Sequence, residues 1–169
     1  KVIVNKISIN KNSLLELEKN LLLFYIGKTR NSSTILQDQI NQIEENNQET
    51  LNALHYVKEL SEKMYSLLSQ SDITKFGELL NIGWESKKKF AKDVTNEYVD
   101  KLYNLGIEYG ALGGKLTGAG GGGHLLFYCE PSKQKNLIEK MQGQGLKQVQ
   151  YKFHESGCKV LDLYDFTNT

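Results

Sequence analysis

Apolar and polar residues alternate along the first 26 positions in short runs that are typical of strands and short helices. Val2–Ile9 is rich in β-branched side chains and predicts a strand, although its alternation is imperfect. A short helix is expected over Ser13–Asn20, and the apolar run Leu21–Ile26 has the length of a buried strand. This part of the chain therefore predicts two strands separated by a crossing helix.

After Gly27 the apolar residues are spaced by three and four positions, which is the spacing of amphipathic helices. Ser32 or Ser33 is placed to cap the first of these helices. The apolar stripes, which we interpret as core, are Ile35, Leu36, Ile40 and Ile43, then Leu51, Leu54, Val57, Leu60, Met64, Leu67 and Leu68, then Phe76, Leu79, Leu80 and Trp84, and finally Tyr98, Leu102 and Leu105. The polar stretch Glu44–Thr50 fits either a helix extension or a break between two helices.

The last third of the chain returns to strand patterns. His124–Tyr128 predicts a strand, and Pro131 suits the first turn of a helix that runs to about Gln142. Val149–Phe153 and Lys159–Leu163 alternate in the manner of two further strands. The whole pattern predicts an α+β fold with a sheet of four or five strands.

The size and charge of the chain narrow the classes of function. Its 169 residues fit a single domain, residues 1–169, and 21 basic residues nearly balance 20 acidic ones. Such a balance gives no overall field that favours nucleic acid or an anionic membrane, and no apolar run is long enough to span a bilayer. We therefore expect a soluble chain with small-molecule ligands. A homodimer that forms through the long helices is a further possibility.

The two cysteines, Cys129 and Cys158, have neither CxxC spacing nor a nearby histidine partner for a zinc site. We interpret them as buried free thiols, which favours a reducing, cytoplasmic setting.

Glycine is concentrated in one segment, because seven of the 15 glycines fall within Gly113–Gly123. Glycine loses more conformational entropy on folding than other residues. We therefore expect this concentration of glycines to be required by the backbone conformation and not by packing. Side-chain-free backbone can adopt positive φ and can bring its N–H groups close to an anion. The segment therefore predicts a phosphate-handling loop, although a merely tight β-turn is the alternative.

Three known phosphate motifs do not fit this loop. The spacing of glycines from Gly118 to Gly123 matches a dinucleotide fingerprint, but a strand at His124–Tyr128 follows where that motif requires a helix. A P-loop is excluded because the preceding Gly-Lys pair is followed by Leu116 and not by Ser or Thr. The glycine-rich lid of protein kinases lacks its valine and its lysine-bearing strand here.

The run Gly114–Tyr128, GKLTGAGGGGHLLFY, strongly resembles the third, C-terminal motif of the GHMP kinases, which include galactokinase, homoserine kinase and mevalonate kinase. The segment Leu22–Leu36, LLFYIGKTRNSSTIL, looks like the matching part of one branch, the D-glycero-D-manno-heptose 7-phosphate kinases. The chain also enters a β-rich run directly after Lys1, which favours a piece of a longer protein.

The resemblance implies a ferredoxin-like C-terminal domain with four antiparallel strands and additional helices. It further implies that an N-terminal domain, absent from this chain, carries the main phosphate loop, the magnesium ligands and the catalytic carboxylate. ATP and Mg²⁺ would then be held mainly by that domain, and no catalytic residue is expected here. The loop residues that carry over are Gly118, Gly120, Gly121, Gly122 and Gly123, with the expected role of shaping the site and donating N–H groups to ATP.

Basic residues before the first long helix form a second candidate site. Lys28 and Arg30 flank Thr29 just ahead of a helix N-terminus, where free N–H groups and cations attract anions. We expect Arg30 to bind a sugar phosphate, with Lys28, Thr29 and the loop-proximal Lys115 as further contacts, because guanidinium binds phosphate through two hydrogen bonds. A solvated loop is the alternative. The run Lys87–Lys89 is interpreted as the solvated side of a helix.

The histidines are not expected to act in catalysis. His124 stands where the family usually has a small or apolar residue, and His55 and His154 have no carboxylate partner in motif spacing.

The resemblance implies ATP-dependent transfer of a γ-phosphoryl group to the anomeric hydroxyl of a heptose 7-phosphate, and the chain alone is expected to be inactive. Another sugar or mevalonate-pathway kinase, or a non-catalytic anion-binding module, remains open.

Overall fold

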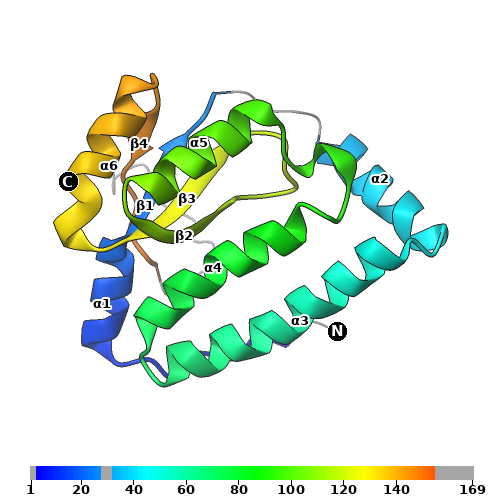
Figure 1. Ribbon diagram of the computed structural model, residues 1–169. Coiled ribbons are helices and arrows are strands. Elements are labelled where there is room, and N and C mark those ends of the chain that lie inside the picture. The colour runs from blue at the N-terminus through cyan, green and yellow to red at the C-terminus, as the bar shows by residue number, and fades with distance from the viewer. Residues whose placement is uncertain (1–2, 28–31, 155–169) are drawn as a thin grey trace, which may run out of the picture.

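The computed structural model describes residues 3–27 and 32–154, in which six α-helices, one 3₁₀ helix and four strands follow one another (Figure 1). Their order is α1 (Lys11–Asn20), β1 (Leu21–Tyr25), α2 (Ser32–Glu44), α3 (Gln48–Ser69), α4 (Ile73–Lys87), η1 (Lys92–Val94), α5 (Glu97–Glu108), β2 (Ala111–Leu116), β3 (His124–Cys129), α6 (Pro131–Gly143) and β4 (Lys147–Val149). None of the described helices is both long and apolar enough to cross a membrane.

The four strands form one antiparallel sheet in the order β2-β3-β1-β4. In the central pair, Phe24 of β1 lies opposite Leu125 of β3, and Leu125 lies opposite Leu116 of β2 on its other side. Helices cover this sheet, so the predicted α+β fold with a ferredoxin-like, four-stranded antiparallel sheet and additional long helices is confirmed.

The two faces of the sheet enter two separate hydrophobic clusters, because successive strand residues point to opposite sides. Phe24 and Phe127 lie in one cluster with buried residues of α5 and α6. Leu21 and Tyr128 lie in the other, with Leu17 of α1 and residues of α4. α4 lies between the sheet and α3, which runs beside it (Figure 1).

Close packing of helices on the sheet explains several of the glycines. A Cβ on Gly77 of α4 would overlap the ring of Tyr128, and one on Gly113 of β2 would overlap the carbonyl of Gly77 and lie 2.7 Å from the amide nitrogen of Asn81. The expectation that packing does not account for glycines in Gly113–Gly123 is therefore wrong at Gly113, because α4 crosses β2 at backbone contact distance.

Polar side chains set the helix boundaries that the apolar pattern left open. The Oδ1 atom of Asn47 accepts hydrogen bonds from the N–H groups of Glu49 and Thr50 at 3.0 and 3.2 Å, so it caps α3. Glu44–Thr50 is consequently a break between two helices and not an extension of one. Asp72 and Asn96 cap α4 and α5 in the same way.

Three expectations about strands and stripes differ from the structure. The described part of the first predicted strand, residues 3–9, pairs with no described strand and leaves Val4 88% exposed, because β-branched residues alone do not supply a neighbour. β4 covers Lys147–Val149 and ends before most of the predicted range 149–153. Leu36, Ile40 and Ile43 of α2 form an exposed stripe, since only Ile35 of that helix is buried. The expected strand Lys159–Leu163 lies outside the described residues.

Candidate functional site

The glycine loop joins β2 to β3 and has a backbone that other residues would resist. Gly118, Gly120, Gly121 and Gly123 have φ angles of 78°, 132°, 74° and 101°, whereas Gly122 is not among the residues with positive φ. The tip of this hairpin points toward the side of the molecule where α2 lies (Figure 1). The positive-φ conformation expected from the glycine concentration is therefore present at four of the loop positions.

Two other segments of the chain hold the loop in place. Gly121 donates its N–H to the carbonyl of Val94 in η1 at 2.9 Å, and its own carbonyl accepts from Asn96 Nδ2 at 3.3 Å. At the other end, Ile26 donates its N–H to the carbonyl of Gly123 at 2.9 Å. The loop is thus tied to the end of β1 and to the segment before α5, and it is more constrained than its composition alone implies.

Gly120 is the position where the loop approaches η1 most closely. A Cβ on Gly120 would lie 2.6 Å from the carbonyl oxygen and 2.7 Å from the Cα of Val94, and its φ of 132° is one that L residues rarely adopt. Within the described residues, the N–H groups of Gly118, Gly120 and Gly122 have no hydrogen-bond acceptor. Gly118 is exposed, Gly120 is half-buried and Gly122 is buried, and the loop's expected role of N–H donation to a ligand stays a prediction.

Lys87, in the last turn of α4, contacts the loop directly. Its ammonium donates a hydrogen bond to the carbonyl of Gly118. Burial, and secondly repulsion from Lys115 of β2, lower the pKa of Lys87 to about 8. The interpretation of Lys87–Lys89 as a solvated helix side is wrong for Lys87 and Lys88, which are half-buried, and only Lys89 is exposed. The helical spacing of four and three residues from Leu80 to Trp84 to Lys87 was the missed signal. Because Leu80 and Trp84 are buried, Lys87 lies on the buried side of the helix.

Aromatic side chains support the strand that carries Lys115. The hydroxyl of Tyr103 lies 2.7 Å from Asn81 Oδ1 and 3.3 Å from the carbonyl oxygen of Gly114. Burial raises the pKa of this hydroxyl, so it stays protonated and can donate. Trp84 is 1% exposed, and the centroid of its ring lies 5.8 Å from that of Tyr103. The strand that leads into the loop therefore packs on buried aromatic side chains.

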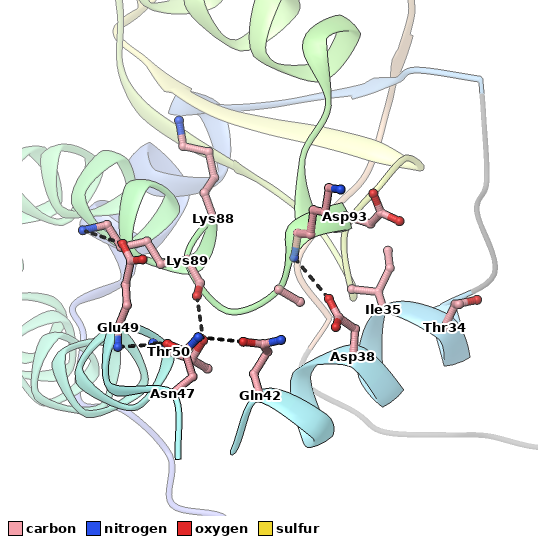
Figure 2. A pocket seen from close by; sticks show the side chains of 12 residues that line it. Thr34, Ile35, Asp38, Gln42, Asn47, Glu49, Thr50, Lys88, Lys89 and Asp93 are labelled. Atoms are coloured by element: carbon pink, nitrogen blue, oxygen red, sulfur yellow. Dashed lines mark hydrogen bonds and ion pairs between the residues drawn. The ribbon is translucent and has the colours of Figure 1, made fainter. Parts of the chain in front are cut away.

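A pocket of about 640 Å³ opens beside η1, between α2 and the start of α3 (Figure 2). Most of its polar groups bind one another. Lys92 N–H donates to Asp38 at 3.2 Å, Thr50 donates to the carbonyl of Lys89 at 3.1 Å, and Asn47 donates to Gln42 at 2.7 Å. Lys88 points away from this network in Figure 2 and pairs with Glu85 instead. The polar residues that line the pocket therefore hold α2, η1 and the start of α3 together. η1 also contacts the glycine loop through Val94.

The remaining predicted site residues are placed as follows. Lys115 is half-buried on β2 and lies beside Lys87. Lys28, Thr29 and Arg30 lie outside the described residues, so the expected sugar-phosphate contact at the start of α2 stays a prediction.

The histidines do not form a cluster. His124 packs its ring 5.1 Å from that of Tyr25, and His55 and His154 are exposed. Among the described residues, no three His, Cys, Asp or Glu side chains come together as metal ligands. Burial raises the pKa of the Cys129 thiol to about 11, as expected for an unreactive core cysteine.

The sequence matches a family model described as GHMP kinases C terminal over residues 64–147. This range begins within α3 and ends at the start of β4, so it contains the glycine loop, Lys87 and Lys115.

Individual relatives agree with this match. The chain is 30% identical over 159 residues to the D-glycero-alpha-D-manno-heptose 7-phosphate kinase of Campylobacter jejuni, covering 94% of this chain but 46% of that protein. It is similar to the crystal structure of a putative sugar kinase from Campylobacter jejuni, with a TM-score of 0.66, 29% identity, and coverage of 93% of this chain and 43% of the other. It shares its fold with L. major mevalonate kinase solved with R-mevalonate, with a TM-score of 0.68, 16% identity, and coverage of 76% and 40%. The chain thus spans about half the length of these relatives.

Proposed function

Because this chain belongs to the GHMP kinase family as a C-terminal domain, we propose that it forms one half of an ATP-dependent small-molecule kinase. The other half would be an N-terminal domain, which the relatives' greater length supports. The phosphorylated substrate we propose is D-glycero-D-manno-heptose 7-phosphate, at its anomeric hydroxyl. The similarity to a heptose 7-phosphate kinase over 94% of this chain supports that choice.

The glycine loop is the observation that carries the proposal. Its positive-φ backbone lies beside two lysines and presents N–H groups that have no acceptor among residues 3–27 and 32–154. A loop of this kind stabilises the negative charge of a transferring phosphoryl group without a side chain of its own. Gly118 and Gly120–Gly123 are therefore proposed to border the phosphates of ATP.

The proposed reaction forms a bond between the sugar's anomeric oxygen and the γ-phosphorus of ATP. The bond from that phosphorus to the β-phosphate oxygen breaks, and ADP leaves. The hydroxyl proton passes to a carboxylate of the N-terminal domain, which would also hold Mg²⁺ for the most part. This chain contributes binding and position, so the separate C-terminal domain would be inactive.

The residues ahead of α2 are proposed to recognise the substrate's own phosphate. Lys28, Thr29 and Arg30 precede the N-terminus of α2 in the sequence, where an anion is favoured, and Lys115 of β2 is proposed as a further contact. A cytoplasmic location, inferred from the two cysteines, belongs to the same proposal, and a homodimer contact through the long helices stays open.

The proposal is tested with the full-length protein, by measuring ADP release with heptose 7-phosphate, galactose and mevalonate as acceptors. Turnover with the heptose phosphate alone is expected. Turnover with galactose or mevalonate only would keep the kinase class and reject the substrate. No ADP release with any acceptor would favour a non-catalytic anion-binding module.

A residue-level test replaces Gly121 by Val, because a branched side chain at a φ of 74° is strained and would displace the loop. We expect ATP-dependent turnover to fall by at least about a hundredfold, in the range seen when one hydrogen-bond donor to the transition state is lost. Unchanged kinetics would mean that the loop is only a turn.

A further inference from the structure

Lys87 and Lys115 form a pair of like charges at the base of the glycine loop. Both side chains are half-buried, and repulsion from Lys115 contributes to the lowered pKa of Lys87. Within the described residues, neither ammonium has a carboxylate oxygen within 4.0 Å. The pair is therefore not neutralised by the part of the protein that the structure describes.

Three other lysines of the described residues pair with carboxylates. Lys75 pairs with Asp72 at 2.7 Å, Lys88 with Glu85 at 2.7 Å, and Lys89 reaches Glu49 at 3.9 Å. The chain as a whole carries a net charge of only +1, so acidic partners are not scarce. Two adjacent ammonium groups kept partly out of water are costly, and proteins retain such arrangements where an anion binds.

We propose that Lys87 is a binding residue for a phosphoryl group, which it holds together with Lys115 and the N–H groups of the glycine loop. This proposal rests on the proposed kinase function for the source of the phosphoryl group, and it deepens that function by adding a residue from α4. It goes beyond the loop itself, because Lys87 stands 31 positions from Gly118 in the sequence.

The geometry gives Lys87 two connected roles. Its hydrogen bond to the carbonyl of Gly118 fixes the first loop residue that has positive φ. That contact turns the ammonium toward the hairpin, where the N–H groups of Gly120 and Gly122 have no described acceptor. A phosphoryl dianion would match the two positive charges and accept hydrogen bonds from the N–H groups. The dianion could come from ATP or from the phosphate of a sugar phosphate.

The first experiment measures binding without catalysis. Isothermal titration of the full-length protein with tripolyphosphate is compared among the wild type, Lys87→Met, Lys87→Arg and Lys89→Met. We expect Lys87→Met to weaken binding at least about tenfold, as for loss of a charge-assisted hydrogen bond. Lys87→Arg should retain most of the affinity. Lys89→Met is the matched control, because Lys89 is exposed and pairs only weakly with Glu49.

A wild-type affinity in Lys87→Met would overturn the proposal. If Lys87→Met does not fold, Lys115→Met replaces it, and an unchanged affinity in that variant would overturn the proposal equally. Equal weakening in Lys87→Met and Lys89→Met would show a general charge effect and would also count against it.

The second experiment separates the two sources of phosphate by steady-state kinetics. In Lys87→Met, a raised KM for ATP with an unchanged KM for the sugar phosphate would assign Lys87 and Lys115 to the nucleotide. A raised KM for the sugar phosphate alone would assign them to the substrate. Either result supports a phosphoryl site. Unchanged KM and kcat for both would overturn it. If no acceptor gives turnover in the wild type, the proposed function fails, while the tripolyphosphate titration still decides the role of Lys87.

Discussion

Two groups of glycines in this domain occupy opposite environments. Gly77 and Gly113 sit where α4 crosses β2, with no room for a Cβ. Gly118 and Gly123 sit in the loop between β2 and β3, where a Cβ would meet nothing within 4 Å, and both have positive φ. The first group is required by packing, and the second by backbone conformation and by the open space around it.

The two environments predict different consequences for substitution, on stability at the α4–β2 crossing and on the proposed function in the loop. A substitution at the α4–β2 crossing acts on the fold, because a Cβ would collide with the Tyr128 ring at Gly77 and with the backbone of α4 at Gly113. A substitution in the loop is expected to act on the proposed phosphate site, because the loop has free space around Gly118 and Gly123 but requires positive φ there. Gly120 belongs to both groups, since it has positive φ and also touches Val94.

The largest effect is expected for Gly113→Ala. The new Cβ would overlap the carbonyl oxygen of Gly77 and push α4 away from the sheet. We expect the free energy of unfolding to fall by about 3 kcal/mol or more, at the upper end of overpacking costs. Urea denaturation of the full-length protein measures this change. A loss below about 1 kcal/mol would show that α4 shifts freely and would remove the distinction between the two groups.

Gly120→Ala is expected to damage the site more than the fold. Its Cβ would press against Val94 at a disfavoured φ, which costs about 1–3 kcal/mol and displaces the loop. We expect turnover of the full-length enzyme to fall at least about tenfold while its circular dichroism spectrum is retained. Wild-type turnover in a folded variant would contradict the proposed position of the loop at the phosphates.

The pH dependence of anion binding should report on Lys87. Because its pKa is lowered to about 8, Lys87 is mostly charged at pH 7 and mostly neutral at pH 9. We therefore expect tripolyphosphate affinity to fall several-fold between these pH values, because Lys87 loses its charge. In Lys87→Met this step should be missing. A step of equal size in the variant would assign the titration to another group.

The same lowered pKa affects stability with a definite sign. The unfolded chain, where lysine has its ordinary value of 10.5, binds more protons than the native state between about pH 8 and 10.5. The contribution of Lys87 to the unfolding free energy therefore rises with pH across this window. Bound anion should oppose that trend, because it favours the charged form.

Gly118→Ala should give the smallest loss. Its Cβ has free space, so the cost is the strain of positive φ alone, about 1 kcal/mol. Gly143→Ala is the matched control, because Gly143 also has free space but lies at the end of α6 without positive φ. That variant should be stabilised by about 0.5 kcal/mol. Thermal unfolding of both variants measures the change in stability relative to the wild type. A change of the same sign in both variants would show that φ does not decide the effect.

The sequence predicted the elements whose cause is local. Helices α3, α4 and α5 follow from apolar spacing, and the loop's positive φ follows from its glycines. The β2 strand is obscured by Gly113 and Gly114. Gly113 packs against α4, a helix about 35 residues earlier, and Gly114 packs against Leu126 and Phe127 of β3. Helical spacing could have shown that Lys87 faces inward, but its partner at Gly118 could not be predicted, because the crossing of α4 over the sheet brings the two together.

Trp84 has a practical consequence for studying this domain in solution. It is the single tryptophan of the chain, it is buried against Tyr103, and it precedes Lys87 by one helical turn. Its indole fluorescence therefore samples the last turn of α4, where the ammonium meets the loop. We expect binding of the proposed anion to change this emission, so that stopped-flow fluorescence would follow it without a dye, with Trp84→Phe supplying the background signal.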